Sequence, residues 1–175
     1  MPEMLFNVVY VVSLTLLSVY GIHTLLLSII FLAVRRKNRQ QPPAPPEIWP
    51  PITVQLPIYN EKYVAERLIQ AACGLDYPKQ ALSIQVLDDS TDETLVLTRQ
   101  LVAQCQARGI QIELIHREDR SGYKAGALQH GLQTATGEYT AIFDADFVPP
   151  ADFLKRLVPY LTANPQLGMV QARWG

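Results

Sequence analysis

The stretch IQVLDDSTDET, residues 84–94, decides the fold because it joins an apolar strand to the start of a helix. Residues 84–87 have the length and composition of a buried strand. Residues 90–93 match a capping box, in which a Ser and a Glu side chain satisfy free N–H groups of a first helical turn. The stretch therefore predicts a strand–helix unit that is connected by two acids, Asp88 and Asp89.

The same alternation of strand and helix repeats from residue 52 onward. Further strands are predicted at residues 52–56, 110–115, 139–143 and 167–172. Further helices are predicted at residues 61–73, with Asn60 as cap and Gly74 as stop, at 124–134, and from Pro150 to before Pro165. Strands that alternate with helices predict an α/β fold: a mainly parallel sheet with helices on both faces. Such sheets bind ligands at the carboxyl ends of their strands.

The N-terminal segment differs in kind, because residues 5–34 contain no charged side chain. At about 1.5 Å per residue this segment exceeds the ~30 Å hydrocarbon core of a bilayer and predicts a transmembrane helix. A signal peptide has a basic start and an apolar core of only about 7–15 residues, so this longer segment does not match one. The basic cluster at residues 35–39 follows at once, which predicts that residues 35–175 face the cytosol.

Residues 42–51 contain six prolines and predict a stiff polyproline spacer. The predicted organisation is a transmembrane helix at residues 5–34, a basic and Pro-rich linker at 35–51, and a domain at 52–175. The whole chain holds 15 basic and 16 acidic residues, a balance that argues against a nucleic-acid partner. Its two cysteines, Cys73 and Cys105, lack zinc-site spacing and are predicted to be buried and reduced.

A second pair of acids, Asp144 and Asp146, follows the strand predicted at residues 139–143. In extended chain, residues i and i+2 point to the same side, and paired carboxylates suit Mg²⁺ or Mn²⁺. The alternative is that one of them caps the next helix, just as Asp88 and Asp89 could be turn residues. The loop before the helix at 124–134 offers Lys124 and free N–H groups for phosphate, or a merely solvated lysine. Together these residues predict a site for a nucleoside diphosphate and a bridging metal.

Several long stretches resemble glycosyltransferase family 2, which has a GT-A (Rossmann-like) fold. The similarity is closest to the cellulose-synthase-like 4-beta-mannosyltransferases that make mannan and glucomannan backbones. It is carried by AACGLDYP (71–78), IQVLDDSTDET (84–94), REDRSGYKAGAL (117–128), AIFDADFVPPADFLKRLVPYL (141–161) and NPQLGMVQARWG (164–175).

The resemblance implies a role for each matching residue. Asp89 would accept an N–H of the nucleotide base, and Tyr59 and Glu61 would line the nucleotide pocket. Lys124 would contact the diphosphate. Asp144 and Asp146 would form the family's Asp-x-Asp metal site, with Asp144 also near the ribose and phosphate.

The reaction implied is metal-dependent, inverting transfer of a hexose to a growing β-1,4-glycan. The donor would be GDP-mannose or UDP-glucose. The resemblance places the general base and the acceptor-binding Gln-x-x-Arg-Trp motif downstream. Residues 171–174 have only one residue between Gln171 and Arg173, so they do not supply that motif.

No residue of this chain is therefore assigned as the general base. The chain is expected to be the truncated, donor-binding half of an enzyme, with a possible C-terminal remainder, and to be inactive alone. Two alternatives stay open. One is a catalytically inactive, membrane-anchored nucleotide-sugar-binding fragment, and the other is a nucleotidyltransferase.

Overall fold

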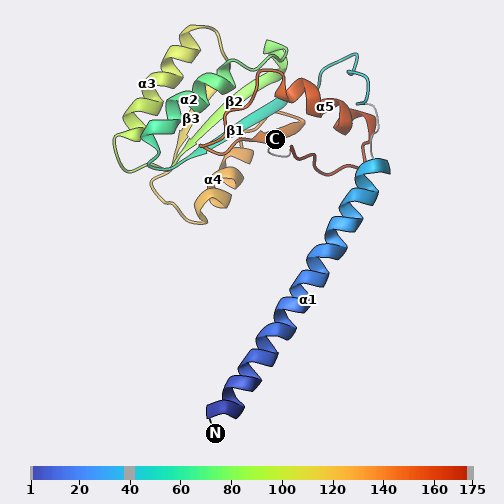
Figure 1. Cartoon of the computed structure of the whole chain (residues 1–175). Coiled ribbons are helices and arrows are strands. Elements are labelled where there is room, and N and C mark those ends of the chain that lie inside the picture. Colours follow the sequence, from blue (N-terminus) through green and yellow to red (C-terminus); the bar gives the residue numbers. More distant parts are fainter. Residues whose placement is uncertain (1, 38–41, 173–175) are drawn as a thin grey trace. The chain divides into compact units, whose positions relative to one another are not determined.

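The computed structural model describes residues 2–37 and 42–172, with side chains described for 2–34 and 42–172. The chain forms two compact units, Met1–Gln41 and Pro42–Gly175, which are treated separately. Figure 1 shows the order of the elements.

The first unit is the helix α1 (Pro2–Lys37). Its residues Pro2–Val34 are long and apolar enough to cross a membrane. Four hydroxyls of this helix, those of Thr15, Ser18, Thr24 and Ser28, donate to carbonyls one turn earlier at 2.8–2.9 Å. These bonds satisfy the hydroxyls within the helix, as an apolar environment requires. The side chains of the basic cluster at residues 35–39 lie outside the described residues.

The second unit contains a four-stranded sheet with the order β3-β2-β1-β4. The strands are β1 (Ile52–Ile58), β2 (Leu82–Asp88), β3 (Ile112–His116) and β4 (Tyr139–Ile142). Every neighbouring pair is parallel, which confirms the expected parallel sheet. In the register, Ile58 lies opposite Asp88, and Asp88 lies opposite His116. The loops that leave β1, β2 and β3 therefore start at one edge of the sheet.

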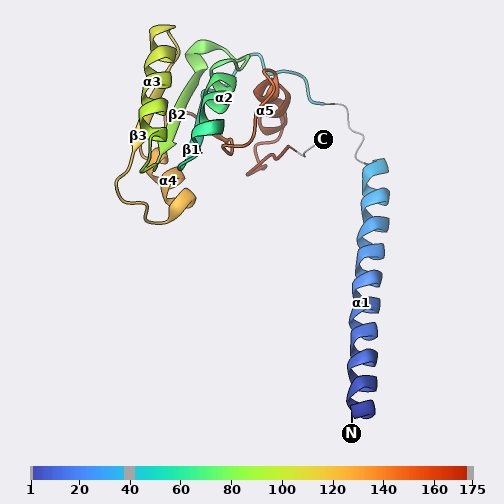
Figure 2. The same ribbon diagram turned by 60° about the vertical axis from the view of Figure 1, so that its left-hand side comes forward.

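Helices cover both faces of this sheet, as the alternation predicts. The helices α2 (Lys62–Cys73) and α3 (Thr94–Ala107) lie on one face, and α4 (Tyr123–Leu132) lies on the other (Figures 1 and 2). The helix α5 (Phe153–Ala163) follows β4, and a 3₁₀ turn at Lys79–Ala81 precedes β2. The hydrophobic core includes Val54 and Leu56 of β1 together with Leu68 of α2.

The face of the sheet under α4 is more polar. There the Gln55 Nε2 atom donates to Gln85 Oε1 at 3.0 Å and to the Leu128 carbonyl at 3.3 Å. At Gly131 a Cβ would lie 2.6 Å from Gln55 Nε2 and 2.8 Å from Leu87 Cδ2. A glycine at this position lets α4 approach the sheet, and this fixes the helix that begins beside Lys124.

The helix caps predicted at Asn60 and Ser90 are wrong, because the side chain of each residue hydrogen-bonds to the neighbouring loop instead. The residues before α2 and α3 are Glu61 and Glu93, and neither caps with its side chain. Asn60 has a positive φ of 54°. The Asn60 N–H donates to Ser90 Oγ at 2.8 Å, and the Thr91 N–H donates to Asn60 Oδ1 at 2.9 Å. Since β1 and β2 are adjacent, their two exit loops lie close enough to bind each other.

The predicted strand at residues 167–172 is also wrong. These residues belong to no strand, and Met169 is 74% exposed. A strand needs a partner for its N–H and C=O groups, and no described segment pairs with this one. The last helix begins at Phe153 rather than at Pro150, whose carbonyl instead accepts the Phe153 N–H at 3.0 Å. Of the two cysteines, Cys105 is buried as predicted, whereas Cys73 is only half-buried.

Candidate functional site

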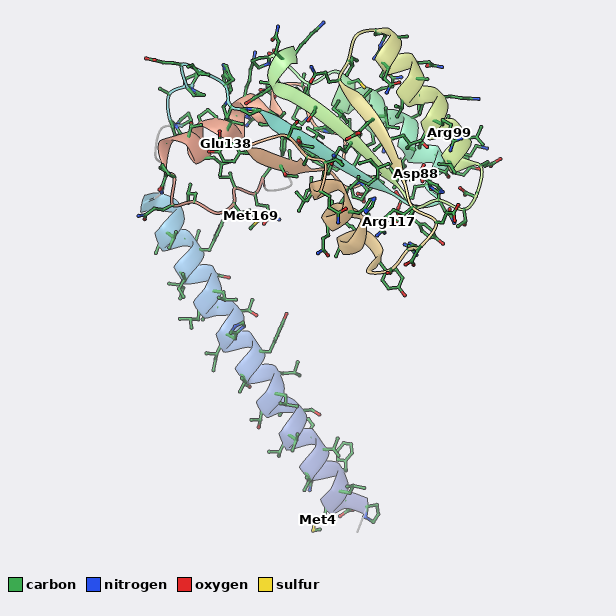
Figure 3. The ribbon with its side chains drawn as sticks, turned by 180° about the vertical axis from the view of Figure 1, so that it is seen from behind. Met4, Asp88, Arg99, Arg117, Glu138 and Met169 are labelled. Atoms are coloured by element: carbon green, nitrogen blue, oxygen red, sulfur yellow. The ribbon has the colours of Figure 1, made fainter. Side chains whose placement is uncertain are left out.

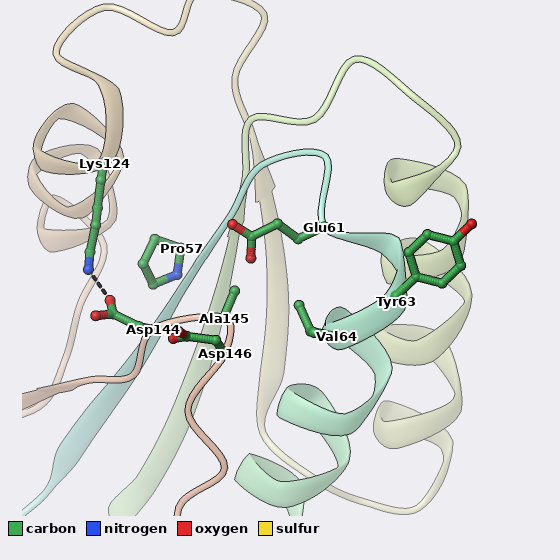
Figure 4. A pocket seen from close by; sticks show the side chains of 8 residues that line it. All are labelled: Pro57, Glu61, Tyr63, Val64, Lys124, Asp144, Ala145 and Asp146. Atoms are coloured by element: carbon green, nitrogen blue, oxygen red, sulfur yellow. Dashed lines mark hydrogen bonds and ion pairs between the residues drawn. The ribbon is translucent and has the colours of Figure 1, made fainter. Parts of the chain in front are cut away.

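A cleft of about 560 Å³ opens where β1 and β4 end (Figure 4). Its lining comes from the β1–α2 segment, the start of α4 and the segment after β4: Pro57, Glu61, Tyr63, Val64, Lys124, Asp144, Ala145 and Asp146. Four of these residues, Glu61, Lys124, Asp144 and Asp146, are sequence-predicted site residues. We call the space that these four side chains share the acidic cleft.

The two acids after β4 enter the cleft from a turn, not from an extended chain. The strand ends at Ile142, and the Phe147 N–H donates to the Asp144 carbonyl at 2.9 Å. Phe143 is 2% exposed and packs edge-on against Phe153 of α5 at 5.1 Å between ring centroids. The extended geometry predicted for this Asp-x-Asp stretch is therefore wrong. A turn anchored by buried aromatic rings nevertheless places both carboxylates in the cleft.

Lys124 lies in the first turn of α4, and its ammonium group forms an ion pair with the Asp144 carboxylate. Both side chains are open to solvent, at 50% exposed for the lysine and 59% for the aspartate. The loop before α4 packs tightly on this first turn, since a Cβ at Gly126 would clash with the Ser121 carbonyl oxygen. The glycine therefore lets the loop fold beside Lys124.

Three carboxylates share the cleft with this one ammonium group. The pKa of Glu61 is raised above its ordinary value by partial burial and then by the charges of Asp146 and Asp144. Lys124 opposes that rise but does not cancel it. The cleft therefore carries excess negative charge, which a cation would neutralise.

The donor atoms of the cleft fit a hard divalent cation, because carboxylate oxygens suit Mg²⁺ and Mn²⁺. Among the described residues, no group of three or more His, Cys, Asp or Glu side chains could hold a metal ion by itself. A metal held by Asp144 and Asp146 would thus need ligand oxygens or water to complete its coordination.

The acids after β2 have different environments from those of the cleft. Asp88 is fully buried; its Oδ1 accepts the Ser90 N–H at 2.8 Å and its Oδ2 accepts the Thr98 hydroxyl at 2.5 Å. It fastens the loop to α3. Figure 3 labels Asp88 at the end of β2, Arg117 just after β3 and Arg99 on α3.

Asp89 is held by Arg117, a residue that the sequence reasoning did not single out. The Arg117 Nε atom donates to Asp89 Oδ1 at 2.9 Å and its Nη2 atom to Oδ2 at 2.5 Å. The pair is nearly buried, at 5% exposed for Asp89 and 13% for Arg117. Arg117 also donates to the Ser121 and Tyr123 carbonyls at 3.2 Å each. It therefore ties Asp89 to the loop that leads to Lys124.

Tyr59 lies outside the residues that line the acidic cleft and stacks with a second arginine that sequence reasoning missed. The Arg120 guanidinium lies 3.3 Å from the Tyr59 ring centroid and 5.1 Å from that of Tyr123. Its Nε atom is buried and has no hydrogen-bond partner among the described residues. The one sequence feature that could have indicated these arginines is their position. Arg117 and Arg120 follow β3, just as the acids follow β2 and β4.

Comparisons with known proteins identify the family of this chain. Residues 53–175 match the family model of glycosyl transferase family 2. Glucomannan 4-beta-mannosyltransferase 9 of Arabidopsis thaliana is 48% identical over 130 residues, which are 72% of this chain and 24% of that protein. Glucomannan 4-beta-mannosyltransferase 2 of the same plant is 50% identical over 133 residues, again 72% of this chain and 24% of the relative. The chain spans about a quarter of the length of these curated relatives.

Solved structures share the fold. The mannosyltransferase PcManGT from Pyrobaculum calidifontis, in complex with GDP-Man and Mn²⁺, superposes with a TM-score of 0.69 at 34% identity, covering 81% of this chain and 41% of that one. TarS from S. aureus, residues 1–349 with UDP, gives a TM-score of 0.56 at 24% identity, covering 65% of this chain and 32% of that one. The expected GT-A architecture is therefore confirmed, and the chain belongs to glycosyl transferase family 2.

Proposed function

We propose that this chain provides the donor-binding half of a membrane-anchored glycosyltransferase. The enzyme would transfer a hexose from a nucleoside diphosphate sugar, GDP-mannose or UDP-glucose, to a growing β-1,4-glycan with inversion. The observation that carries the proposal is the acidic cleft, where Lys124 and the carboxylates of Asp144 and Asp146 lie together at the carboxyl ends of parallel strands.

In the acidic cleft, Lys124 and the free N–H groups that begin α4 would bind the diphosphate of the donor. Asp144 and Asp146 would hold Mg²⁺ or Mn²⁺. When bound, such a cation supplies stabilisation of the negative charge that develops on the leaving diphosphate. Glu61 faces the same space and would orient the donor at the edge of the nucleotide pocket.

The nucleotide base would bind beside Asp89 and Tyr59. Arg117 donates one hydrogen bond to each oxygen of Asp89, and a carboxylate oxygen can accept more than one. Asp89 can therefore still accept an N–H from a base, and guanine and uracil both present one. The relatives named as mannosyltransferases and the neighbour complexed with GDP-Man and Mn²⁺ support GDP-mannose and Mn²⁺ over the alternatives.

The rest of the enzyme would supply the remaining parts of the reaction. Since the chain spans about a quarter of its relatives, we expect the general base and the acceptor site in a C-terminal remainder. The apolar helix α1 would anchor the enzyme in a membrane, with residues 35–175 on the cytosolic side.

Calorimetric titration tests the proposal directly. GDP-mannose and UDP-glucose are each titrated into the full chain with Mn²⁺, with Mg²⁺ and with a chelator, and the series is repeated with Asp146→Ala. We expect one donor to bind only with metal, and we expect the substitution to abolish that binding. Metal-independent binding that survives Asp146→Ala would overturn the metal assignment, and binding of neither donor would overturn the proposed function.

A further inference from the structure

The two cysteines meet between α2 and α3, on the face of the sheet opposite α4 (Figure 1). Cys73 is the last residue of α2, and Cys105 lies in the final turn of α3. Their Sγ atoms are 2.9 Å apart. A disulfide bond is about 2.05 Å long, so a small sulfur movement of less than about 1 Å would close it.

The two thiols differ in their access to solvent. Cys73 is half-buried, whereas Cys105 has no exposed surface. The guanidinium of Arg108, just after α3, donates to Cys105 Sγ at 3.6 Å. The pair thus has an accessible first thiol, an adjacent resolving thiol and a nearby cation.

We propose that Cys73 and Cys105 form a reversible disulfide that joins α2 to α3. With oxidised glutathione as the oxidant, the Cys73 thiolate attacks one glutathione sulfur and expels one glutathione thiolate. Cys105 then attacks the Cys73 sulfur of this mixed disulfide and expels the second glutathione. The two protein thiols lose two protons and two electrons, and one oxidised glutathione becomes two reduced molecules.

We expect the reaction to be slow in the native protein. Burial and the adjacent Cys105 thiol raise the pKa of Cys73 to about 12, so little thiolate is present near neutrality. Slow formation suits a bond that responds to sustained oxidation rather than to brief changes. Once formed, the disulfide links the two helices and lowers the conformational entropy of the unfolded chain.

The crosslink would act on stability rather than on donor binding. Both cysteines lie at the ends of their helices that are remote in sequence from Glu61 and Asp89. We expect oxidation to raise the thermal midpoint by about 5–10 °C. Affinity for the nucleoside diphosphate should stay unchanged, so failure of this proposal and failure of the donor-site proposal give different results.

The test uses the full chain in detergent or nanodiscs. The reduced protein is equilibrated with glutathione buffers of increasing oxidation, quenched with N-ethylmaleimide, and analysed by intact mass and by peptide mapping. We expect both thiols to disappear together, with a Cys73–Cys105 crosslinked peptide. In Cys105→Ser the reaction should stop at a glutathione adduct on Cys73, and in Cys73→Ser the buried Cys105 should stay free.

Three results on the wild-type chain would overturn the proposal, and none depends on a variant that folds. The first is that both thiols remain free at equilibrium with oxidised glutathione. The second is a persistent glutathione adduct on Cys73 without a crosslink. The third is a crosslink between two chains, visible as a dimer on a non-reducing gel.

Discussion

Asp89 and Asp146 are both acids that follow a strand, yet their surroundings are opposite. Asp89 is 5% exposed, and both of its oxygens are already bonded to Arg117. Asp146 lies in an open cleft whose carboxylates raise the pKa of Glu61. Arg117 neutralises the charge of the first acid, whereas the second lies among excess negative charge that a cation would neutralise. Loss of Arg117 should therefore affect folding first, whereas substitutions in the acidic cleft should affect binding.

The largest expected effect is that of Arg117→Ala. Removal of the guanidinium leaves the nearly buried Asp89 carboxylate unpaired, which should lower the free energy of unfolding by about 3 kcal/mol. Arg117→Lys keeps a charge but loses the bidentate geometry, so it should fall between the alanine variant and the wild type. Urea unfolding measures the change, with Arg99→Ala on the exposed side of α3 as the control. Equal stability of the Arg117 and Arg99 variants would show that Asp89 is not held as described.

A smaller loss is expected from Thr98→Val. The Thr98 hydroxyl donates to the buried Asp88 carboxylate at 2.5 Å, and its removal should lower the free energy of unfolding by about 2 kcal/mol. Thr98→Ser keeps the hydroxyl and should retain most of that stability. The same unfolding experiment compares the two variants, and a larger loss in Thr98→Ser than in Thr98→Val would mean that the methyl group, which valine keeps, matters more than the hydroxyl.

Two lysines, one inside the acidic cleft and one outside it, allow a matched test of binding. Lys124 and Lys155 are both exposed and each is paired with an aspartate, but only Lys124 lines the cleft. Exposed pairs contribute little, so either alanine variant should change the unfolding free energy by at most about 1 kcal/mol. Calorimetry should show that Lys124→Ala weakens nucleoside diphosphate binding about tenfold, or ~1.4 kcal/mol. Equal affinities of the two variants would remove Lys124 from the binding site.

The smallest effect concerns Glu61 and pH. Its pKa is raised in the folded state above the ordinary value of 4.5, so the folded protein binds this proton more tightly than the unfolded chain does. Stability should therefore fall as pH rises through the raised pKa. Glu61→Gln should remove this loss, with a gain below about 0.5 kcal/mol because the residue is largely exposed. Unfolding should show the gain near neutral pH but not below the ordinary pKa, and a gain at both would indicate another cause.

Much of the fold could be predicted from local patterns. Apolar runs, glycine stops and their alternation with helices indicated a parallel sheet with helices on both faces, and the strand-end rule brought Lys124, Asp144 and Asp146 together. The predicted caps failed because Asn60 and Ser90 bind across two loops, and local pattern does not show which loops are neighbours. The strand predicted at residues 167–172 failed because pairing depends on a partner, not on composition.

The acidic residues of the candidate site could be predicted from the sequence, whereas Arg117, which pairs with Asp89, could not. Asp89 was singled out, but Arg117 was not, since an arginine after a strand has many possible partners. Only the register of β2 against β3 shows that the Asp89 and Arg117 positions are neighbours. The turn that carries Asp144 and Asp146 likewise depends on Phe143 and Phe153, whose contact crosses from β4 to α5.

Thermal unfolding of the wild type and Asp146→Asn most directly tests the claim that the acidic cleft binds a cation and a nucleoside diphosphate. Each protein is measured alone, with Mn²⁺, and with Mn²⁺ plus GDP at about a hundredfold excess over the dissociation constant. We predict equal midpoints without ligand, and with both ligands a stabilisation of about 2.7 kcal/mol in the wild type only. Equal stabilisation of the two proteins by Mn²⁺ and GDP, or a marked loss of stability in unliganded Asp146→Asn, would contradict the account.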